Sequence, residues 1–267
     1  MGSAARSLCT QSLCRRSLDL GLGLLGACLR LLAASLPNRC LVCHQAMPSP
    51  ATGICPVCLA AGLYSGAVCL GCGRSMVLHA RYCGQCQKSE PLPVLAPCSY
   101  HQGLGPWVAA IKYQRQFAAL PVLSQALAER VKMLEGLGLV RLPQALVPVP
   151  LHPQRLKQRG FNQAWLIAAE LGKLLQLPVV ELGLSRRTHT RPQAGLTGLQ
   201  RRRNLRDAFR LDGAQAYQRI ALVDDVLTTG TTAREIARLF SARNIHVQVW
   251  CLARAEAPGL LDEVTAN

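Results

Sequence analysis

The sequence predicts an α/β fold that follows a small cysteine-rich, metal-binding module. Two segments, residues 145–171 and 219–240, predict the α/β part, because in each an apolar run ends in a polar loop and a helical pattern follows. Four C-x-x-C pairs between residues 40 and 86 predict the metal-binding module. The chain has 267 residues, half of them apolar, so it can form one domain with a sizeable core and a smaller second unit.

The composition is strongly basic. Thirty Lys and Arg residues oppose fourteen Asp and Glu residues, which gives a net charge of +16. Such a charge favours polyanionic partners, whether nucleic acid, diphosphates or an anionic membrane surface. Of the thirteen cysteines, eight fall into C-x-x-C pairs, a pattern typical of metal sites in reducing compartments and not of a secreted disulfide framework. We therefore expect a cytoplasmic protein.

Residues 1–36 are predicted to form an N-terminal extension that is largely helical. Residues 18–36 are apolar, but Asp19 and Arg30 interrupt them, so the run does not predict a membrane span. Residues 21–26 match G-x-G-x-x-G, yet no strand precedes them and no acid follows at the required distance, so we attribute this match to chance. We expect a helix that packs on the rest of the protein or lies peripherally at a membrane surface.

Residues 37–98 are predicted to form the metal-binding module. Two cysteines separated by two residues can ligate one tetrahedral zinc ion together, and two such pairs close a four-thiolate site. Four pairs therefore predict two zinc ions. We expect both ions to be structural, because four thiolates leave no position for a catalytic water. Sequential pairing would give a double zinc ribbon and crossed pairing an interleaved module, and the sequence fits both. The predicted ligands are Cys40, Cys43, Cys55, Cys58, Cys69, Cys72, Cys83 and Cys86.

Residues 99–267 are predicted to form the larger domain, after a proline-rich break at residues 90–97. Helical stripes in residues 107–111 and 121–134 predict core-facing helices. Residues 145–150 then predict a buried strand. Arg155, Lys157 and Arg159 follow this strand, just before a helical pattern that begins at Ala164. Three bases at a strand end predict an anion site, which would suit pyrophosphate if the protein is a transferase; the alternative is an ordinary solvated loop.

Residues 186–210 are too basic to predict a core element. They hold eight arginines and a single acid, Asp207. We expect a flap or a docking surface for a polyanion, in which Arg187 or Arg201 closes over a bound ligand.

Residues 219–240 carry the strongest functional signal. An apolar strand ends in Asp224 and Asp225, whose carboxylates suit a ribose diol or Mg²⁺. A glycine and hydroxyl-rich loop follows, before a helix that we expect to be capped by Thr232 and Glu235. Backbone amides at a helix N-terminus, together with hydroxyl donors, suit a 5′-phosphate. The predicted phosphate-binding residues are Thr228, Thr229, Gly230, Thr231 and Thr232. Residues 246–252 then predict a closing strand.

The acidic motif resembles the site that binds phosphoribosyl pyrophosphate (PRPP) in type I phosphoribosyltransferases. The cysteine module, Lys112 with Tyr113, residues 159–163, residues 193–209 and the acidic motif follow in one order. In that order the chain resembles the ComF/GntX family over about residues 37–255. The resemblance implies a double zinc ribbon before a type I phosphoribosyltransferase-like domain, with a parallel sheet flanked by helices. It also implies a link to DNA uptake in competent bacteria or to use of external DNA, with partners in the competence machinery.

Three hypotheses about function follow. The first is a PRPP-binding, Mg²⁺-dependent phosphoribosyltransferase, that is, a glycosyltransferase, whose acceptor and catalytic residues the sequence does not identify. The second is a single-strand DNA-binding protein of the uptake machinery without transferase activity, which the charge favours although few aromatic residues are available for base stacking. The third is a zinc-ribbon scaffold with a degenerate domain.

Overall fold

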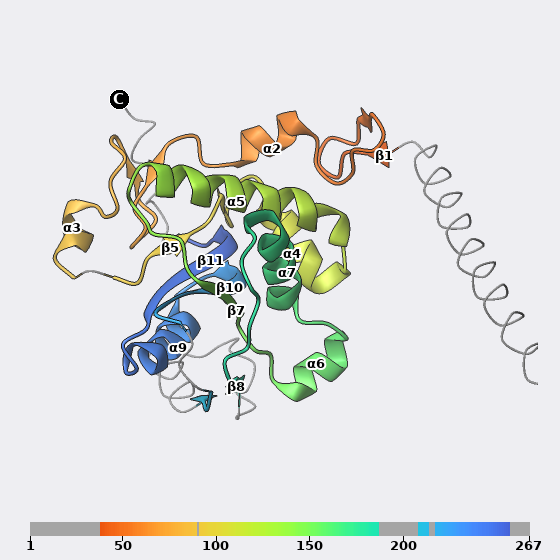
Figure 1. Ribbon diagram of the computed structural model, residues 1–267. Coiled ribbons are helices and arrows are strands. Elements are labelled where there is room, and N and C mark those ends of the chain that lie inside the picture. Colours follow the sequence, from red (N-terminus) through yellow and green to blue (C-terminus); the bar gives the residue numbers. More distant parts are fainter. Residues whose placement is uncertain (1–37, 90, 187–207, 214–216, 257–267) are drawn as a thin grey trace, which may run out of the picture. The chain divides into compact units, whose positions relative to one another are not determined.

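The computed structural model describes residues 38–89, 91–186, 208–213 and 217–256 (Figure 1). The predicted extension over residues 1–36 lies outside the described residues, as do Arg187 and Arg201. The chain divides into two compact units, residues 1–55 and 56–267, which we describe separately. The domain boundaries expected after residues 36 and 98 stay predictions.

The described part of the first unit contains a short hairpin around Cys40 and Cys43. Strands β1 (Asn38–Arg39) and β2 (Ala46–Met47) pair antiparallel. Between them the amide of His44 donates to the carbonyl of Cys40 at 2.9 Å, which closes a tight turn. His44 takes a positive φ of 59° in this turn. The turn gives Cys40 and Cys43 the close spacing that one metal ion requires.

The second unit begins with a similar arrangement. Helix α2 (Pro56–Gly62) leads to strands β3 (Ala67–Val68) and β4 (Ser75–Met76), which pair antiparallel, and helix α3 (Gly84–Gln87) follows. In the turn between the strands, the amide of Gly73 donates to the carbonyl of Cys69 at 2.9 Å. This hairpin therefore repeats the geometry of the first at the third cysteine pair.

A parallel sheet forms the centre of the second unit, as the α/β prediction requires. Its order is β5 (Val94–Leu95), β11 (His246–Arg254), β10 (Arg219–Leu227) and β7 (Ala145–Pro148), and β6 (Cys98–Ser99) also pairs with β11. Every pair in this sheet is parallel. All strands therefore end at one edge, where open α/β sheets bind ligands.

Helices cover the sheet. Helices α4 (Gly105–Gln114) and α5 (Leu120–Gly136) lie on one side, with the short helix η1 (Phe117–Ala119) between them, and α9 (Thr231–Ser241) lies on the other (Figure 1). Helices α6 (Pro153–Arg159) and α7 (Gln163–Leu175) follow β7. On the side of α9, the buried core includes Ile236 and Phe240 with Ile220 and Leu222 of β10. The apolar spacing that predicted this helix therefore marks its core face.

The arginine-rich segment begins and ends in a small hairpin. Strands β8 (Leu184–Arg186) and β9 (Phe209–Leu211) pair antiparallel, with Arg186 opposite Phe209.

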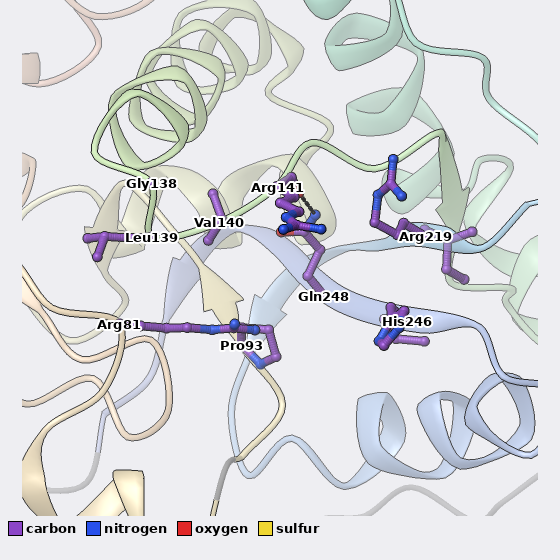
Figure 2. A pocket seen from close by; sticks show the side chains of 11 residues that line it. Arg81, Pro93, Gly138, Leu139, Val140, Arg141, Arg219, His246 and Gln248 are labelled. Atoms are coloured by element: carbon purple, nitrogen blue, oxygen red, sulfur yellow. Dashed lines mark hydrogen bonds between the residues drawn. The ribbon is translucent and has the colours of Figure 1, made fainter.

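At the amino edge of the central sheet, β10 begins at Arg219 and β11 at His246, close to the loop at Arg141 (Figure 2). Among the residues that the structure describes, no helix has both the length and the apolar character needed to cross a membrane.

Candidate functional site

The eight paired cysteines form two groups, and the pairing is sequential. In each group the four sulfur atoms lie within 4.8 Å of one another. The first group joins the first two C-x-x-C pairs and the second joins the last two, which decides between the two pairings that the sequence left open. Four thiols at this spacing fit one tetrahedral zinc ion. The groups are Cys40, Cys43, Cys55 and Cys58, and Cys69, Cys72, Cys83 and Cys86.

Backbone amides favour the thiolate form in both groups. The amide of Cys55 donates to Sγ of Cys40 at 3.3 Å, and the amide of Cys83 donates to Sγ of Cys69 at 3.2 Å. Burial opposes ionisation of Cys40, but amide donors outweigh it and lower the pKa of this thiol to about 6. The thiolate is the form that ligates zinc. The donor set and its surroundings thus fit two structural zinc ions.

A polar cavity of about 270 Å³ lies at the carboxyl edge of the parallel sheet. It gathers predicted site residues from three parts of the sequence: the acidic strand end of β10, the hydroxyl-rich loop after it, and the basic segment after β7. The predicted residues that line it are Asp224, Asp225, Thr228, Thr232, Arg155 and Arg159. Lys157, Thr229, Gly230 and Thr231 are not among its lining residues.

The two acids differ in their surroundings. Asp225 is 4 % exposed, and its carboxylate lies 3.4 Å from Nζ of Lys112 in an ion pair. Asp224 is half-buried, and its Oδ1 accepts a hydrogen bond from the amide of Asp225 at 2.9 Å. Burial first, and then the neighbouring charge of Asp225, raise the pKa of Asp224 well above its ordinary value. Two acids held this close favour a cation or hydroxyl donors between them.

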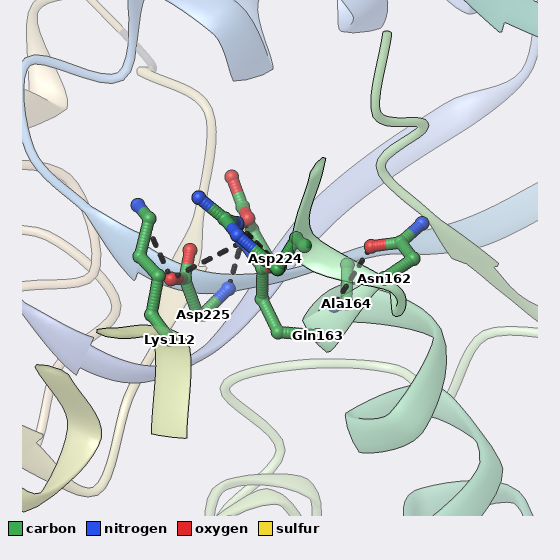
Figure 3. A network of polar contacts seen from close by, with 7 residues as sticks. Lys112, Asn162, Gln163, Ala164, Asp224 and Asp225 are labelled. Atoms are coloured by element: carbon green, nitrogen blue, oxygen red, sulfur yellow. Dashed lines mark hydrogen bonds and ion pairs between the residues drawn. The ribbon is translucent and has the colours of Figure 1, made fainter. Parts of the chain in front are cut away.

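A chain of polar contacts links the acids to the basic segment (Figure 3). Nη1 of Arg159 donates to Oε1 of Gln163 at 2.8 Å, and Nε2 of Gln163 lies 3.5 Å from Oδ2 of Asp225. Asn162 caps helix α7, since its Oδ1 accepts from the amide of Ala164 at 3.1 Å. The first turn of α7 thereby fixes the positions of Gln163 and Arg159 relative to the acids.

The hydroxyl-rich loop joins β10 to the N-terminus of α9. The helix begins at Thr231, its N-cap is Gly230 with a φ of 66°, and no side chain caps it. The predicted capping by Thr232 and Glu235 is therefore wrong. Because only glycine adopts this φ without strain, the loop can turn here and leave the first amides of α9 without a side-chain cap. This arrangement suits an anion at the helix N-terminus.

Cations surround the acids on the cavity wall. Arg155 and Arg159 come from α6 and Lys112 from α4, and Arg186 comes from the strand that precedes the arginine-rich segment. The guanidinium of Arg186 lies 5.3 Å from the ring centroid of Phe209. Burial first, and then the charge of Arg155, lower the pKa of Arg186. The four cations outnumber the two acids among the lining residues, and an excess of positive charge favours a multiply charged anion.

Sequence reasoning assigned no binding role to several cavity residues. Lys112 and Tyr113 end an apolar helix, and Tyr100 follows β6. Gln163 begins α7. Arg186, which ends β8, belongs to residues 186–210, the segment that the sequence predicted to bind a polyanion. A lysine at the end of an otherwise apolar helix, and an amide just after a glycine-containing turn, are signals that could have identified Lys112 and Gln163. The contribution of Tyr100 depends on the tertiary fold, because no local pattern marks it.

A buried arginine connects the sheet to the second cysteine group. Arg254, at the end of β11, donates to the carbonyls of Leu70 at 3.3 Å, Cys69 at 3.5 Å and Gly71. Its own carbonyl accepts from the amide of Tyr100 at 2.7 Å. Arg254 thus contacts both the turn that holds Cys69 and Cys72 and Tyr100, which lines the cavity.

Comparisons with known proteins agree with this architecture. A family model described as a double zinc ribbon domain matches residues 31–87. Competence protein F of Haemophilus influenzae is 35% identical over 223 residues, which cover 81% of this chain and 97% of the relative. The DNA utilization protein YhgH of Escherichia coli strain K12 is 33% identical over 223 residues, which cover 82% of this chain and 98% of the relative. On these similarities, the chain belongs to the ComF family.

Proposed function

We propose that this chain binds PRPP, or a closely related phosphoribosyl ligand, with Mg²⁺, and that it acts in the uptake or use of external DNA. One observation carries the first part: a single cavity at the carboxyl edge of a parallel sheet joins two acids, a hydroxyl-rich loop and a set of cations. PRPP presents a ribose diol, a terminal phosphate and a pyrophosphate. The cavity offers a matching group for each of them.

The acids provide the ribose half of the proposed site. Asp224 and Asp225 would accept hydrogen bonds from the ribose hydroxyls. Lys112 and Gln163 hold Asp225 in place through the ion pair at 3.4 Å and the contact at 3.5 Å. The pKa of Asp224 is raised in the free protein. Bound Mg²⁺ or the hydroxyl donors of the diol would lower it and so favour the ionised form.

The loop and the basic segment provide the phosphate halves. The first amides of α9 and the hydroxyls of the loop would bind the 5′-phosphate, with Thr228 and Thr232 facing the cavity. Arg155 and Arg159 would face the pyrophosphate, and Mg²⁺, when bound, would neutralise part of its charge. Lys157, Arg187 and Arg201 stay as proposed contributors to the basic segment and to its flap.

If transfer occurs, the reaction is displacement of pyrophosphate from ribose C1 by an acceptor. The transition state carries positive charge on the sugar and growing negative charge on the leaving group, so positioning and charge neutralisation dominate. The residues described here supply both, because the acids face the sugar and the arginines face the leaving group. We assign no residue to activation of the acceptor, and the proposal therefore concerns ligand binding first.

The names of the relatives support the second part. Proteins called competence protein F and DNA utilization protein share about a third of their residues with this chain over nearly their whole length. The net charge of +16 is compatible with work on a polyanion. The rival hypothesis is a single-strand DNA-binding protein without transferase activity. Arginines that line two cavities at the amino edge of the sheet favour nucleic-acid binding and do not bear on transferase activity.

Calorimetry with PRPP and Mg²⁺ tests the ligand assignment. We expect saturable heat with the wild-type protein and a loss of affinity of about 100-fold or more in Asp224→Asn/Asp225→Asn, since two charged acceptors are lost. Zinc content and thermal unfolding of the variant serve as folding controls. Equal heats for the two proteins would remove the assignment. Release of pyrophosphate in the presence of candidate bases would then separate a transferase from a protein that only binds the ligand.

A further inference from the structure

A second concave surface lies at the opposite edge of the same sheet. Two adjoining cavities of about 370 and 740 Å³ share Arg81, Pro93, His246 and Val247. We call these two cavities together the amino-edge groove. It begins where β10 and β11 start, at Arg219 and His246 (Figure 2). Asp224 lies five positions after Arg219 along β10, which places the groove about 17 Å along the strand from the acidic pair.

The charge of this groove has one sign. The basic residues that line it are Arg81, Arg141, Arg219, Arg234, Arg238 and His246, and among the residues that the structure describes no Asp or Glu lines either cavity. Within the described part of the chain, only Arg238 among these residues is in an ion pair, with Glu235 at 3.6 Å. An uncompensated cluster of guanidinium groups on a concave surface raises the local concentration of anions.

The groove residues are held by contacts that leave charge available. The carbonyl of Arg141 accepts a hydrogen bond from Nε2 of Gln248 at 2.9 Å, which fixes the backbone while the side chain is exposed (Figure 2). Arg219 donates from Nε to the carbonyl of Leu142 at 3.4 Å, and this bond does not use its terminal nitrogens. The positions are thus defined by the fold, and the guanidinium groups remain able to donate to phosphate oxygens.

We propose that the amino-edge groove is a second anion-binding site, separate from the phosphoribosyl cavity, which binds a row of phosphodiesters in one strand of nucleic acid. Two adjoining cavities with cations along both provide more room and charge than one terminal phosphate requires. Among the described residues on the groove wall, Tyr82 is the only Phe, Tyr or Trp, and the guanidinium of Arg81 lies over its ring at 5.2 Å. Binding therefore depends on phosphates and not on base stacking, and it is insensitive to base sequence.

Fluorescence anisotropy with a labelled thymidine oligonucleotide tests the site in the full-length, zinc-loaded protein. We expect Arg81→Gln/Arg141→Gln to weaken binding about tenfold and to make the dependence of log affinity on log salt shallower by about 1.4, since each lost phosphate contact contributes about 0.7. The matched control is Lys88→Gln/Lys132→Gln, which removes the same charge from exposed positions outside the groove. We expect the control to bind nearly as well as the wild-type protein.

Two further variants keep the result independent of folding and of the phosphoribosyl proposal. Arg141→Glu leaves the zinc module unchanged, and we expect a comparable loss of oligonucleotide affinity. Asp224→Asn/Asp225→Asn should retain oligonucleotide binding, and Arg81→Gln/Arg141→Gln should retain the heat with PRPP and Mg²⁺. Failure of the phosphoribosyl assignment would thus leave the groove assignment intact, and the reverse also holds.

Two outcomes would overturn the proposal. If the groove and control variants lose affinity equally, binding reflects the overall charge and not this groove. If the groove variant loses affinity for inorganic tripolyphosphate but binds the oligonucleotide like the wild-type protein, the groove is a site for a small anion and not for a strand.

Discussion

The two edges of the central sheet differ in the sign of the charged side chains that line their cavities. At the carboxyl edge two acids, a hydroxyl-rich loop and several cations meet in one cavity. The amino-edge groove, as far as the described residues show, is lined by cations without acids. A mixed site selects a ligand that presents both hydroxyl donors and phosphates at fixed positions. A cationic groove accepts any polyanion of suitable shape. One sheet can therefore support a selective site and a general one.

The edges also differ in their relation to the zinc module. Arg254 ties the carboxyl end of β11 to the turn that holds Cys69, through bonds to three carbonyls. Glu256, just beyond, accepts from Oγ of Ser99 at 2.7 Å and from the hydroxyl of Tyr64. The module contributes Arg81 to the amino-edge groove but anchors the carboxyl edge through buried bonds. Arg254 thus links the module to the selective site, because its carbonyl also accepts from the amide of Tyr100.

We expect Arg254→Leu to have the largest effect. The variant leaves three carbonyls without their donor in a buried place, and we expect the free energy of unfolding to fall by about 3 kcal/mol. Chemical denaturation at neutral pH measures this change. Arg238→Leu, at an exposed position on α9, is the control and should change stability little. Equal effects of the two substitutions would show that the second cysteine group does not anchor this edge.

Lys112→Met should have the next largest effect, and only at the carboxyl edge. The positive charge of Lys112 lowers the pKa of Asp224, so its loss raises this pKa further. Ionised acids are needed for the proposed ligand, so the affinity for PRPP at neutral pH should fall about tenfold. The pH at which half of the binding is lost should rise. Calorimetry over a pH series measures both, and an unchanged pH profile would contradict the proposed role of the pair.

The sequence indicated which residues end and follow β10 at the carboxyl edge, but not which distant residues contact them. The acids, the loop and Gly230 are contiguous, so one strand and one turn place them, and local pattern was sufficient. Lys112 reaches Asp225 from a helix more than a hundred positions earlier, and only the packed fold brings the two together. Sequential pairing of the cysteines was likewise open in the sequence, because the spacing between successive pairs is nearly uniform.

The amino-edge groove was not predicted at all. The sequence drew attention to residues 186–210, where arginines are dense, whereas the groove collects single arginines from the zinc module, from the loop after α5, from β10 and from α9. An isolated arginine in a sequence is typical of an ordinary exposed position. Topology makes these arginines a cluster, since parallel strands bring all their amino ends to one edge.

Asp224→Asn should increase stability while it removes ligand binding. The pKa of Asp224 in the folded protein lies above its ordinary value of 3.8, so the neutral carboxyl favours the fold. The stabilisation from the neutral form is complete below the unfolded pKa and is lost as pH rises through the folded pKa. The variant should therefore melt a few degrees above the wild-type protein at about pH 8 and equally at about pH 4.

Thermal melts at the two pH values check this prediction. Asp212→Asn, at an exposed position in an ion pair with Arg210, is a suitable control outside the cavity. A wild-type protein that is more stable than Asp224→Asn at the higher pH would show that this carboxylate is compensated in the free protein. The ionised carboxylate of Asp224 would then not destabilise the protein before it binds its ligand.

The smallest expected effect comes from a pair of glycines, one at each edge. Gly230 has a φ of 66° in the hydroxyl-rich loop, and Gly138 has a φ of 70° beside the amino-edge groove. Alanine at either position should cost about 1 kcal/mol of stability, because a side chain disfavours the left-handed region. An added Cβ at Gly138 meets open space, whereas at Gly230 it lies 3.3 Å from Nη1 of Arg234.

The two substitutions should thus match in stability and differ in binding. Arg234 donates to the carbonyl of Thr229, so displacing its guanidinium disturbs the loop proposed to bind the 5′-phosphate. Gly230→Ala should weaken PRPP binding several-fold in calorimetry, while Gly138→Ala leaves it unchanged. Gly138→Ala should not alter oligonucleotide binding by more than its loss of stability explains. If Gly230→Ala and Gly138→Ala affect PRPP binding equally, the conformation of the hydroxyl-rich loop does not contribute to PRPP binding. The contrast between the two edges would then depend on charge alone.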